Sequence, residues 1–116
     1  MKIKIKRVYE KPCREDGIRV LVDRLWPRGL TKEKAAIDIW LKNIAPSTEL
    51  RKWFDHDPNK WKPFMRRYLM ELKRNKEQTL VLKEQAKQGT VTLLYGAKDE
   101  EHNEALVLKK YLSDNT

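Results

Sequence analysis

The sequence predicts an α/β fold, a single layered domain with a mostly parallel sheet of about four strands flanked by helices. Two short runs, "GIRVLVD" and "TVTLLYG", are apolar on nearly both faces, as is typical of central strands in a parallel sheet. The segments between the predicted strands carry helical periodicity instead. No repeat, low-complexity tract or Gly/Ser linker interrupts the chain, so we expect residues 1–116 to form a single α/β domain.

Four segments are predicted as strands. Residues 2–8, "KIKIKRV", alternate with period two, and their lysines are typical of an edge strand. Residues 17–23 and 90–96 are the two apolar runs, and residues 37–44, "IDIWLKNI", alternate as a third strand, although a helix is an alternative for so short a run. The connection between the first two strands is too short for a comfortable parallel crossover of about a dozen residues or more. We therefore expect the first strand to pair elsewhere in the sheet.

Helix signals fill the rest of the chain. Thr31 is expected to cap a single turn, and Ser47 a helix that breaks before Pro58. Asn75 is expected to cap a helix that ends near Gly89, and Asp99 is expected to cap the final helix. The clearest amphipathic stripe lies between these helices, and we predict that it is buried and has no direct ligand role: Trp61, Phe64, Met65, Tyr68, Leu69 and Leu72.

Composition narrows the classes of partner. The formal net charge of +9 favours anionic partners, with an anionic small molecule first and nucleic acid as an alternative. No apolar stretch approaches the length of a membrane span, and the N-terminal segment does not resemble a signal peptide. Cys13 is the only cysteine, so an intrachain disulfide is excluded, and with only two histidines no metal site and no cofactor are expected. We expect a cytoplasmic protein that does not associate with membranes.

Three polar groups follow predicted strand ends, where ligands bind in open α/β sheets. These groups are "DRLWPRG" after the second strand, "APS" after the third and "YGAKDEEHN" after the last. Two of them also open a helix, where free backbone N–H groups favour an anion. Since the carboxyl ends of parallel strands lie at the same edge, we expect Arg24, Arg28, Ser47 and His102 to lie within one cleft.

Each candidate residue also has a structural interpretation. Asp23 is either a turn-capping carboxylate or a general base, and the structural role is the commoner one. Arg24 and Arg28 offer planar forks for phosphate or carboxylate, or pair with the chain's own acids. We expect Arg24 to pair with an acid and Arg28 to face solvent at the mouth of the cleft. Trp26 is a candidate for stacking on a ligand ring, but a Trp is more often part of the core.

His102 is the second candidate for proton transfer. A cap at Asp99 would place it in the first turn of the last helix, where the dipole keeps the imidazole neutral. Asn103 beside it is a candidate for contacting an oxyanion. Ser47 lacks a nucleophile-elbow sequence and is expected to act as a helix cap before it acts on a ligand. The alternative interpretation is that His102 is an ordinary surface residue.

The same motifs resemble a known family. The segments "DGIRVLVDRLWPRGL", "APSTELRKWFDHDP", "VTLLYGAKD" and "HNEALVL" are similar to the YeaO-like family of small bacterial proteins. The resemblance runs over nearly the whole chain, and it implies a compact α/β domain in a cytoplasmic prokaryotic protein of unknown function. The family positions carried over are Asp23, Arg24, Trp26, Pro27, Arg28, Gly29, Pro46, Ser47, His102 and Asn103.

The function expected from the residues is a small enzyme or ligand-binding protein that acts on an anionic metabolite resembling a nucleotide or a sugar phosphate. Arg24, Arg28 and their neighbours would hold the anion, and Asp23 or His102 would move a proton. The alternative is a nucleic-acid-binding or regulatory protein that uses its basic surface.

Overall fold

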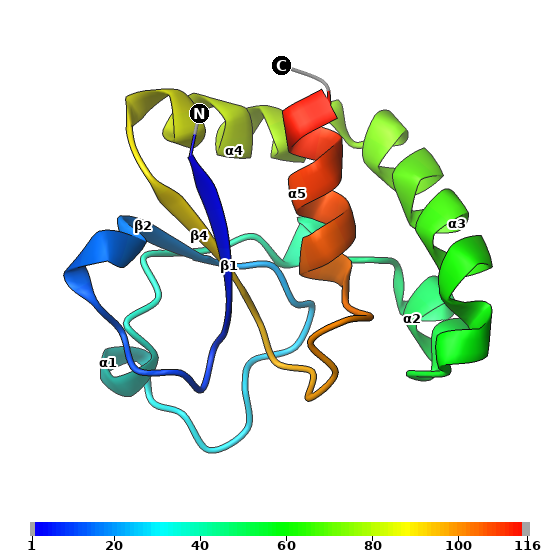
Figure 1. Ribbon diagram of the computed structural model, residues 1–116, viewed down its shortest axis with the longest axis horizontal. Helices are drawn as coiled ribbons and strands as arrows, with labels where there is room; N and C mark the ends of the chain where they lie inside the picture. The colour runs from blue at the N-terminus through cyan, green and yellow to red at the C-terminus, as the bar shows by residue number, and fades with distance from the viewer. Residues whose placement is uncertain (1, 115–116) are drawn as a thin grey trace.

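Four parallel strands form one sheet in the computed structural model, which describes residues 2–114 (Figure 1). The order across the sheet is β1-β4-β2-β3. The strands are β1 (Ile3–Arg7), β2 (Ile18–Leu21), β3 (Ile39–Trp40) and β4 (Val91–Tyr95). The predicted α/β class and the mostly parallel sheet are therefore confirmed. The first strand is an edge strand that pairs with the last one, so the expectation that it pairs away from β2 is also confirmed.

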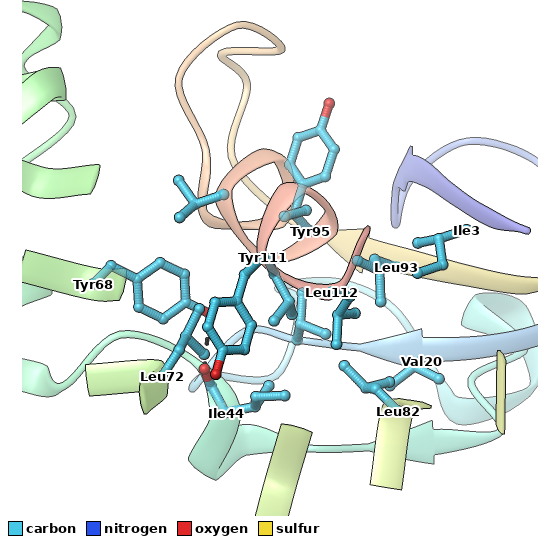
Figure 2. Packing of buried hydrophobic residues seen from close by; sticks show 14 of the residues in the cluster. Ile3, Val20, Ile44, Tyr68, Leu72, Leu82, Leu93, Tyr95, Tyr111 and Leu112 are labelled. Carbon is cyan, nitrogen blue, oxygen red and sulfur yellow. Dashed lines mark hydrogen bonds between the residues drawn. The ribbon is translucent and has the colours of Figure 1, made fainter. Parts of the chain in front are cut away.

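The third strand is much shorter than predicted. Only Ile39 and Trp40 pair with β2, and the chain then enters a 3₁₀ turn, η2 (Lys42–Ile44). This turn buries Ile44, whose carbonyl accepts a hydrogen bond of 2.8 Å from the hydroxyl of Tyr68 (Figure 2). The alternation beyond Trp40 therefore reflects a turn that anchors on helix α3, and the prediction of a long third strand is wrong.

Within the described residues, five helices accompany the sheet, and two further 3₁₀ turns complete the regular structure. The α-helices are α1 (Lys32–Ala35), α2 (Thr48–Phe54), α3 (Trp61–Arg74), α4 (Lys76–Gln88) and α5 (Glu104–Asp114). The remaining 3₁₀ turns are η1 (Arg14–Asp16) and η3 (Pro58–Lys60). Thr31 and Ser47 cap α1 and α2 through their hydroxyl oxygens, as predicted. Asn75 holds the N-cap position of α4 but makes no capping bond, because its side-chain amide donates to the carbonyl of Asn43 instead.

The two faces of the sheet are covered unequally. Val20 and Leu93 point into a large core shared with α2, α3, α4 and α5 (Figures 1 and 2). Leu21 and Leu94, which alternate with them, face a small cluster that includes Ala35 of α1. The predicted stripe of α3 enters the large core only in part: Phe64, Tyr68 and Leu72 are buried, and Trp61, Met65 and Leu69 are half-buried at its edge.

A buried ionic cluster lies under the thinly covered face. The carboxylate of Asp16 accepts hydrogen bonds from Lys6, Arg19 and the backbone N–H and thiol of Cys13. Burial alone would raise the pKa of Asp16, but these donors outweigh it and hold that pKa well below its ordinary value. The other guanidinium N–H groups of Arg19 donate to the carbonyls of residues 35 and 36. The cluster thus joins η1, β1, β2 and the end of α1.

Within residues 2–114, no helix is long and apolar enough to cross a membrane.

Candidate functional site

A cleft of about 480 Å³ opens at the carboxyl ends of the central strands. The connections that follow β2, β3 and β4 form one side of it, and α2, its C-terminal turn and α3 form the other. Its volume is in the range of small-molecule sites. The lining residues are Asp23, Arg24, Leu25, Arg28, Ala45, Pro46, Arg51, Phe54, His56, Phe64, Gly96, Ala97, His102, Asn103 and Glu104.

Most of the predicted site residues meet in this cleft. Asp23, Arg24, Arg28, His102 and Asn103 all line it. The three connections come together because parallel strands end at one edge of the sheet, as the order of the strands requires. The prediction of one shared cleft therefore holds for Arg24, Arg28 and His102.

Ser47 and Trp26 do not line the cleft. The Ser47 hydroxyl caps α2 through the N–H of Leu50 and donates to Glu71 Oε2 at 2.6 Å. Trp26 packs edge-on against Trp40, with ring centroids 5.4 Å apart, and its indole N–H donates to a backbone carbonyl. Both side chains are thus satisfied within the fold, and the prediction that Ser47 lies in the shared cleft is wrong.

Arg24 is tied to the backbone and not to an acid. Its Nε and Nη2 donate to the carbonyls of Pro46 and Ala45, each at 3.2 Å. The expected pairing of Arg24 with a carboxylate is therefore wrong, because the β3–α2 connection presents two carbonyls at the same place. The arginine fastens that connection to the turn after β2.

Arg28 and Arg51 are the uncommitted cations of the cleft. Both are exposed, and neither guanidinium has a hydrogen-bond or ion-pair partner in the part of the chain that the structure describes. Arg28 faces solvent, as expected for a residue at the mouth. His56 lies nearby in a left-handed conformation with φ of 55°, directly after the similarly left-handed Asp55 that ends α2.

Two carboxyl groups meet deeper in the cleft. Asp23 Oδ2 accepts a hydrogen bond of 2.7 Å from the N–H of Gly96, and a Cβ at that glycine would lie 3.0 Å from the same oxygen. Glu104 begins α5 and turns its carboxyl toward Asp23. Burial, the charge of Asp23 and a hydrogen bond with its carboxyl raise the pKa of Glu104 well above its ordinary value. Its place beside a second carboxyl therefore favours the protonated form of Glu104, which can donate to Asp23.

Glu104 also has an unsatisfied oxygen. Its Oε1 is shielded from solvent and has no hydrogen-bond partner among residues 2–114. A buried polar atom without a partner costs free energy of the order of 1–3 kcal/mol, so the ionised form of Glu104 is unfavourable at this place in the fold.

His102 is held by Asp99 in the bend before α5. Asp99 Oδ1 accepts from the backbone N–H groups of Glu101 and His102, and its Oδ2 lies 2.9 Å from His102 Nδ1. These bonds, the one from Glu101 first, lower the pKa of Asp99. When Nδ1 donates to this carboxylate, Nε2 offers a lone pair, and it has no partner within the described chain.

The predicted start of the last helix is wrong. Helix α5 begins at Glu104, and Asn103 caps it by accepting from the N–H of Leu106 at 3.2 Å. The amide of Asn103 also donates to the carbonyl of Asp99, so the residue is buried and committed to the backbone. His102 consequently lies outside the helix and is oriented by Asp99 and by the edge-on ring of Trp61, 5.3 Å away.

Several cleft residues were not predicted. Glu104 belongs to an acidic stretch of the sequence that also contains Asp99, Glu100 and Glu101. Its carboxyl becomes buried only when α5 packs against the sheet. Arg51 and Phe54 lie on α2 one turn or more beyond its cap, where no local signal distinguishes them from other helix residues. Phe64 belongs to the predicted core stripe, yet its ring also lines the cleft.

Across residues 2–114, no three His, Cys, Asp or Glu side chains are grouped as metal ligands would be.

Comparison with known proteins decides the family. A family model described as the inactive DUF488-N3 subclade matches residues 2–116. The chain belongs to this family. The uncharacterized protein YeaO of Escherichia coli (strain K12) is 46% identical over 112 residues, which cover 97% of each chain. The resemblance to YeaO-like proteins is thereby confirmed.

Other relatives of this DUF488-N3 family member match over a shorter range. Uncharacterized proteins of Mycobacterium tuberculosis (strain ATCC 25618 / H37Rv) and Mycobacterium bovis (strain ATCC BAA-935 / AF2122/97) are each 46% identical over 71 residues. Those residues cover 61% of this chain and 60% of each relative. No solved structure is significantly similar to this chain.

Proposed function

We propose that this protein binds a small anionic metabolite in the cleft at the carboxyl ends of β2, β3 and β4. The observation that carries the proposal is the pair Arg28 and Arg51, two exposed guanidinium groups on the cleft wall without an acidic partner in the described chain. Guanidinium forks match the geometry of phosphate and carboxylate groups. Arg24, although bound to two carbonyls, adds a third positive charge to the same cleft.

Binding without turnover is the form of the proposal that we favour. The family model is described as an inactive subclade, which supports a ligand-binding protein over an enzyme. Asp23 and His102, the two residues predicted to move protons, then orient the ligand. Asp23 does so from the floor of the cleft, and His102 through the nitrogen that Asp99 leaves free.

The aromatic rings of α3 support a small ligand over nucleic acid. Nucleic-acid surfaces combine a basic groove with exposed rings on which bases stack. Here Phe64 and Tyr68 are buried, and the guanidinium of Arg67 lies 4.1 Å above the ring of Trp53. The basic residues of α3 therefore lie on its outer surface while its rings face the core.

The first prediction concerns Arg28. We expect Arg28→Ala to weaken the binding of inorganic phosphate at least fivefold in calorimetric titration at low salt, because the variant removes an unpaired cation from the cleft wall. Its melting temperature without ligand should be nearly unchanged, since the side chain is exposed. A thermal-shift series gives a second measurement, because a ligand at 100 times its dissociation constant stabilises by about 2.7 kcal/mol.

Arg74→Ala is the matched control. Arg74 is an exposed arginine in the last turn of α3 and does not line the cleft. Equal losses in both variants would indicate attraction by the overall charge and would contradict the proposed site. Equal affinity of Arg28→Ala and the parent protein would do so as well. Tight binding of a single-stranded oligonucleotide that Arg28→Ala leaves intact would favour the nucleic-acid alternative.

A further inference from the structure

The charged groups of the cleft differ between its mouth and its interior. Arg28 and Arg51 are exposed at its mouth, and the carboxyls of Asp23 and Glu104 meet in its interior. A ligand that is anionic throughout would suit the mouth and be repelled by the interior. The complementary ligand is anionic at one end only and presents polar, uncharged groups at the other.

The two carboxyl groups present an unusual set of hydrogen-bonding atoms. Two carboxyl groups side by side present several acceptor oxygens, and a carboxyl that is protonated is a donor as well. Asp23 Oδ2 already accepts from the N–H of Gly96, whereas Glu104 Oε1 has no partner in residues 2–114. A ligand group that donates hydrogen bonds is therefore complementary to these carboxyl oxygens.

Hydroxyl groups fit this set better than the alternatives. A hydroxyl donates one hydrogen bond and accepts others, so two neighbouring hydroxyls match a donor and acceptors held together. A cationic group would suit the interior, but it would have to pass the guanidinium groups at the mouth. The rings of Phe54 and Phe64 and the side chain of Ala97 form an apolar wall beside the pair, which suits the C–H face of a carbohydrate.

We propose that the ligand is a polyol phosphate of the sugar-phosphate class, with its phosphate at Arg28 and Arg51 and its hydroxyl groups on Asp23 and Glu104. This inference rests on the proposed function and adds the chemical class of the ligand. The exposed arginines at the mouth of the cleft and the two carboxyl groups that meet further inside it are the observations that carry it.

The test compares two probes on the full chain. Ribose 5-phosphate carries a phosphate and several hydroxyls, and ethyl phosphate carries the phosphate alone. We expect the parent protein to bind ribose 5-phosphate at least tenfold more tightly in calorimetric titration. Glu104→Gln should reduce this preference to less than threefold and leave the affinity for ethyl phosphate unchanged. Arg28→Ala should weaken both probes by a similar factor.

Two further variants keep the test decisive. Asp23→Asn should also lose the preference, and it replaces Glu104→Gln if that variant fails to fold. Glu101→Gln, an exposed acid in the bend before α5 that does not line the cleft, should retain it.

Failures of the two proposals are distinguishable. If ethyl phosphate binds in a manner that depends on Arg28 but ribose 5-phosphate binds no better, the anion site stands and the polyol class is wrong. The polyol class is equally wrong if Glu104→Gln keeps the full preference. If neither probe binds, or if Arg28→Ala affects neither, the proposed function fails and the inference fails with it.

Discussion

Single residues in the cleft combine a structural and a chemical role. Gly96 lacks a side chain where the carboxylate of Asp23 approaches its backbone, so the turn after β4 depends on a small residue as well as on a hydrogen bond. Arg24 fastens one wall, whereas Arg28, four residues later, has no partner in the described chain. Two arginines of one turn thus differ: Arg24 is bonded within the fold, and Arg28 is left for the proposed ligand.

The second prediction concerns the effect of Glu104 on the free energy of unfolding. The pKa of Glu104 is raised in the folded protein. Protonated Glu104 therefore stabilises the fold fully below the pKa of the unfolded chain, which is about 4.3. This stabilisation is lost as the pH rises toward the pKa of the folded protein. We expect Glu104→Gln to raise the free energy of unfolding by about 1–2 kcal/mol at pH 8, because the amide is never ionised and can donate to Asp23. At pH 4 the gain should largely disappear. Urea unfolding at both pH values measures this difference between variant and parent. Equal differences at pH 4 and pH 8 would show that the fold does not raise the pKa of Glu104.

At the scale of elements, side chains at the ends of helices and strands hold the cleft in shape. Ser47 is bonded to Glu71, which ties the start of α2 to α3 and leaves the hydroxyl no free role. Asn103 caps α5 and holds the Asp99 bend at the same time. Both residues were predicted as ligand contacts, and the structure assigns their polar atoms to neighbouring elements, because a helix end inside a packed domain must satisfy its free N–H groups.

The ionic cluster of Asp16 leads to a third prediction. Asp16→Asn should lower the free energy of unfolding at pH 7 by about 3–5 kcal/mol, because it leaves Arg19 buried without its countercharge. The folded pKa of Asp16 is depressed, so its contribution is present above the unfolded pKa of about 3.9 and is lost as pH falls below it. Denaturant titrations at pH 7 and pH 3 should therefore show a smaller difference between variant and parent at pH 3.

Glu33→Gln is the control for this cluster. Glu33 is an exposed acid on α1 outside the cluster, and its replacement should change stability by less than about 0.5 kcal/mol. A loss in Asp16→Asn no larger than this would mean that the ion pairs contribute little beyond the packing around them.

At the scale of the whole molecule, one continuous core links the sheet to α2, α3, α4 and α5. Tyr68, Leu82, Leu93 and Leu112 are each fully buried in that core although they come from four different elements (Figure 2). Since no element has a separate core of comparable size within residues 2–114, loss of one contact surface should expose the others. The prediction of a single domain over residues 1–116 then has a direct thermodynamic test.

We expect equilibrium unfolding to be a single cooperative transition. Helix content, measured by circular dichroism, and the fluorescence of the four tryptophans should follow the same curve in urea, because Trp53 and Trp61 report on α2 and α3 while Trp26 and Trp40 report on the far end of the sheet. Separated transitions would contradict the single domain and would indicate that the helices around α3 unfold independently of the sheet.

The local features of this protein could be predicted from its residues alone. Alternation and apolar runs located the four strands, capping residues located the starts of α1 and α2, and the polar turns after the strands identified one edge of the sheet as the candidate site. The strand and cap predictions succeeded, apart from the length of the third strand, because each depends on neighbouring residues. Asp23, Arg24, Arg28 and His102 were identifiable for the same reason, since each follows a strand end that the pattern reveals.

Which polar atoms remain available for a ligand depends on the packing of distant segments against one another. Arg24, Ser47, Trp26 and Asn103 are satisfied by partners from other segments, including Pro46 and Glu71, and no local pattern shows those partners. Glu104 lies in an acidic stretch that is typical of a solvated surface, yet the packing of α5 moves its carboxyl against Asp23 and raises its pKa. Burial and countercharge are properties of the assembled fold, because they depend on distances between residues that are far apart in the chain.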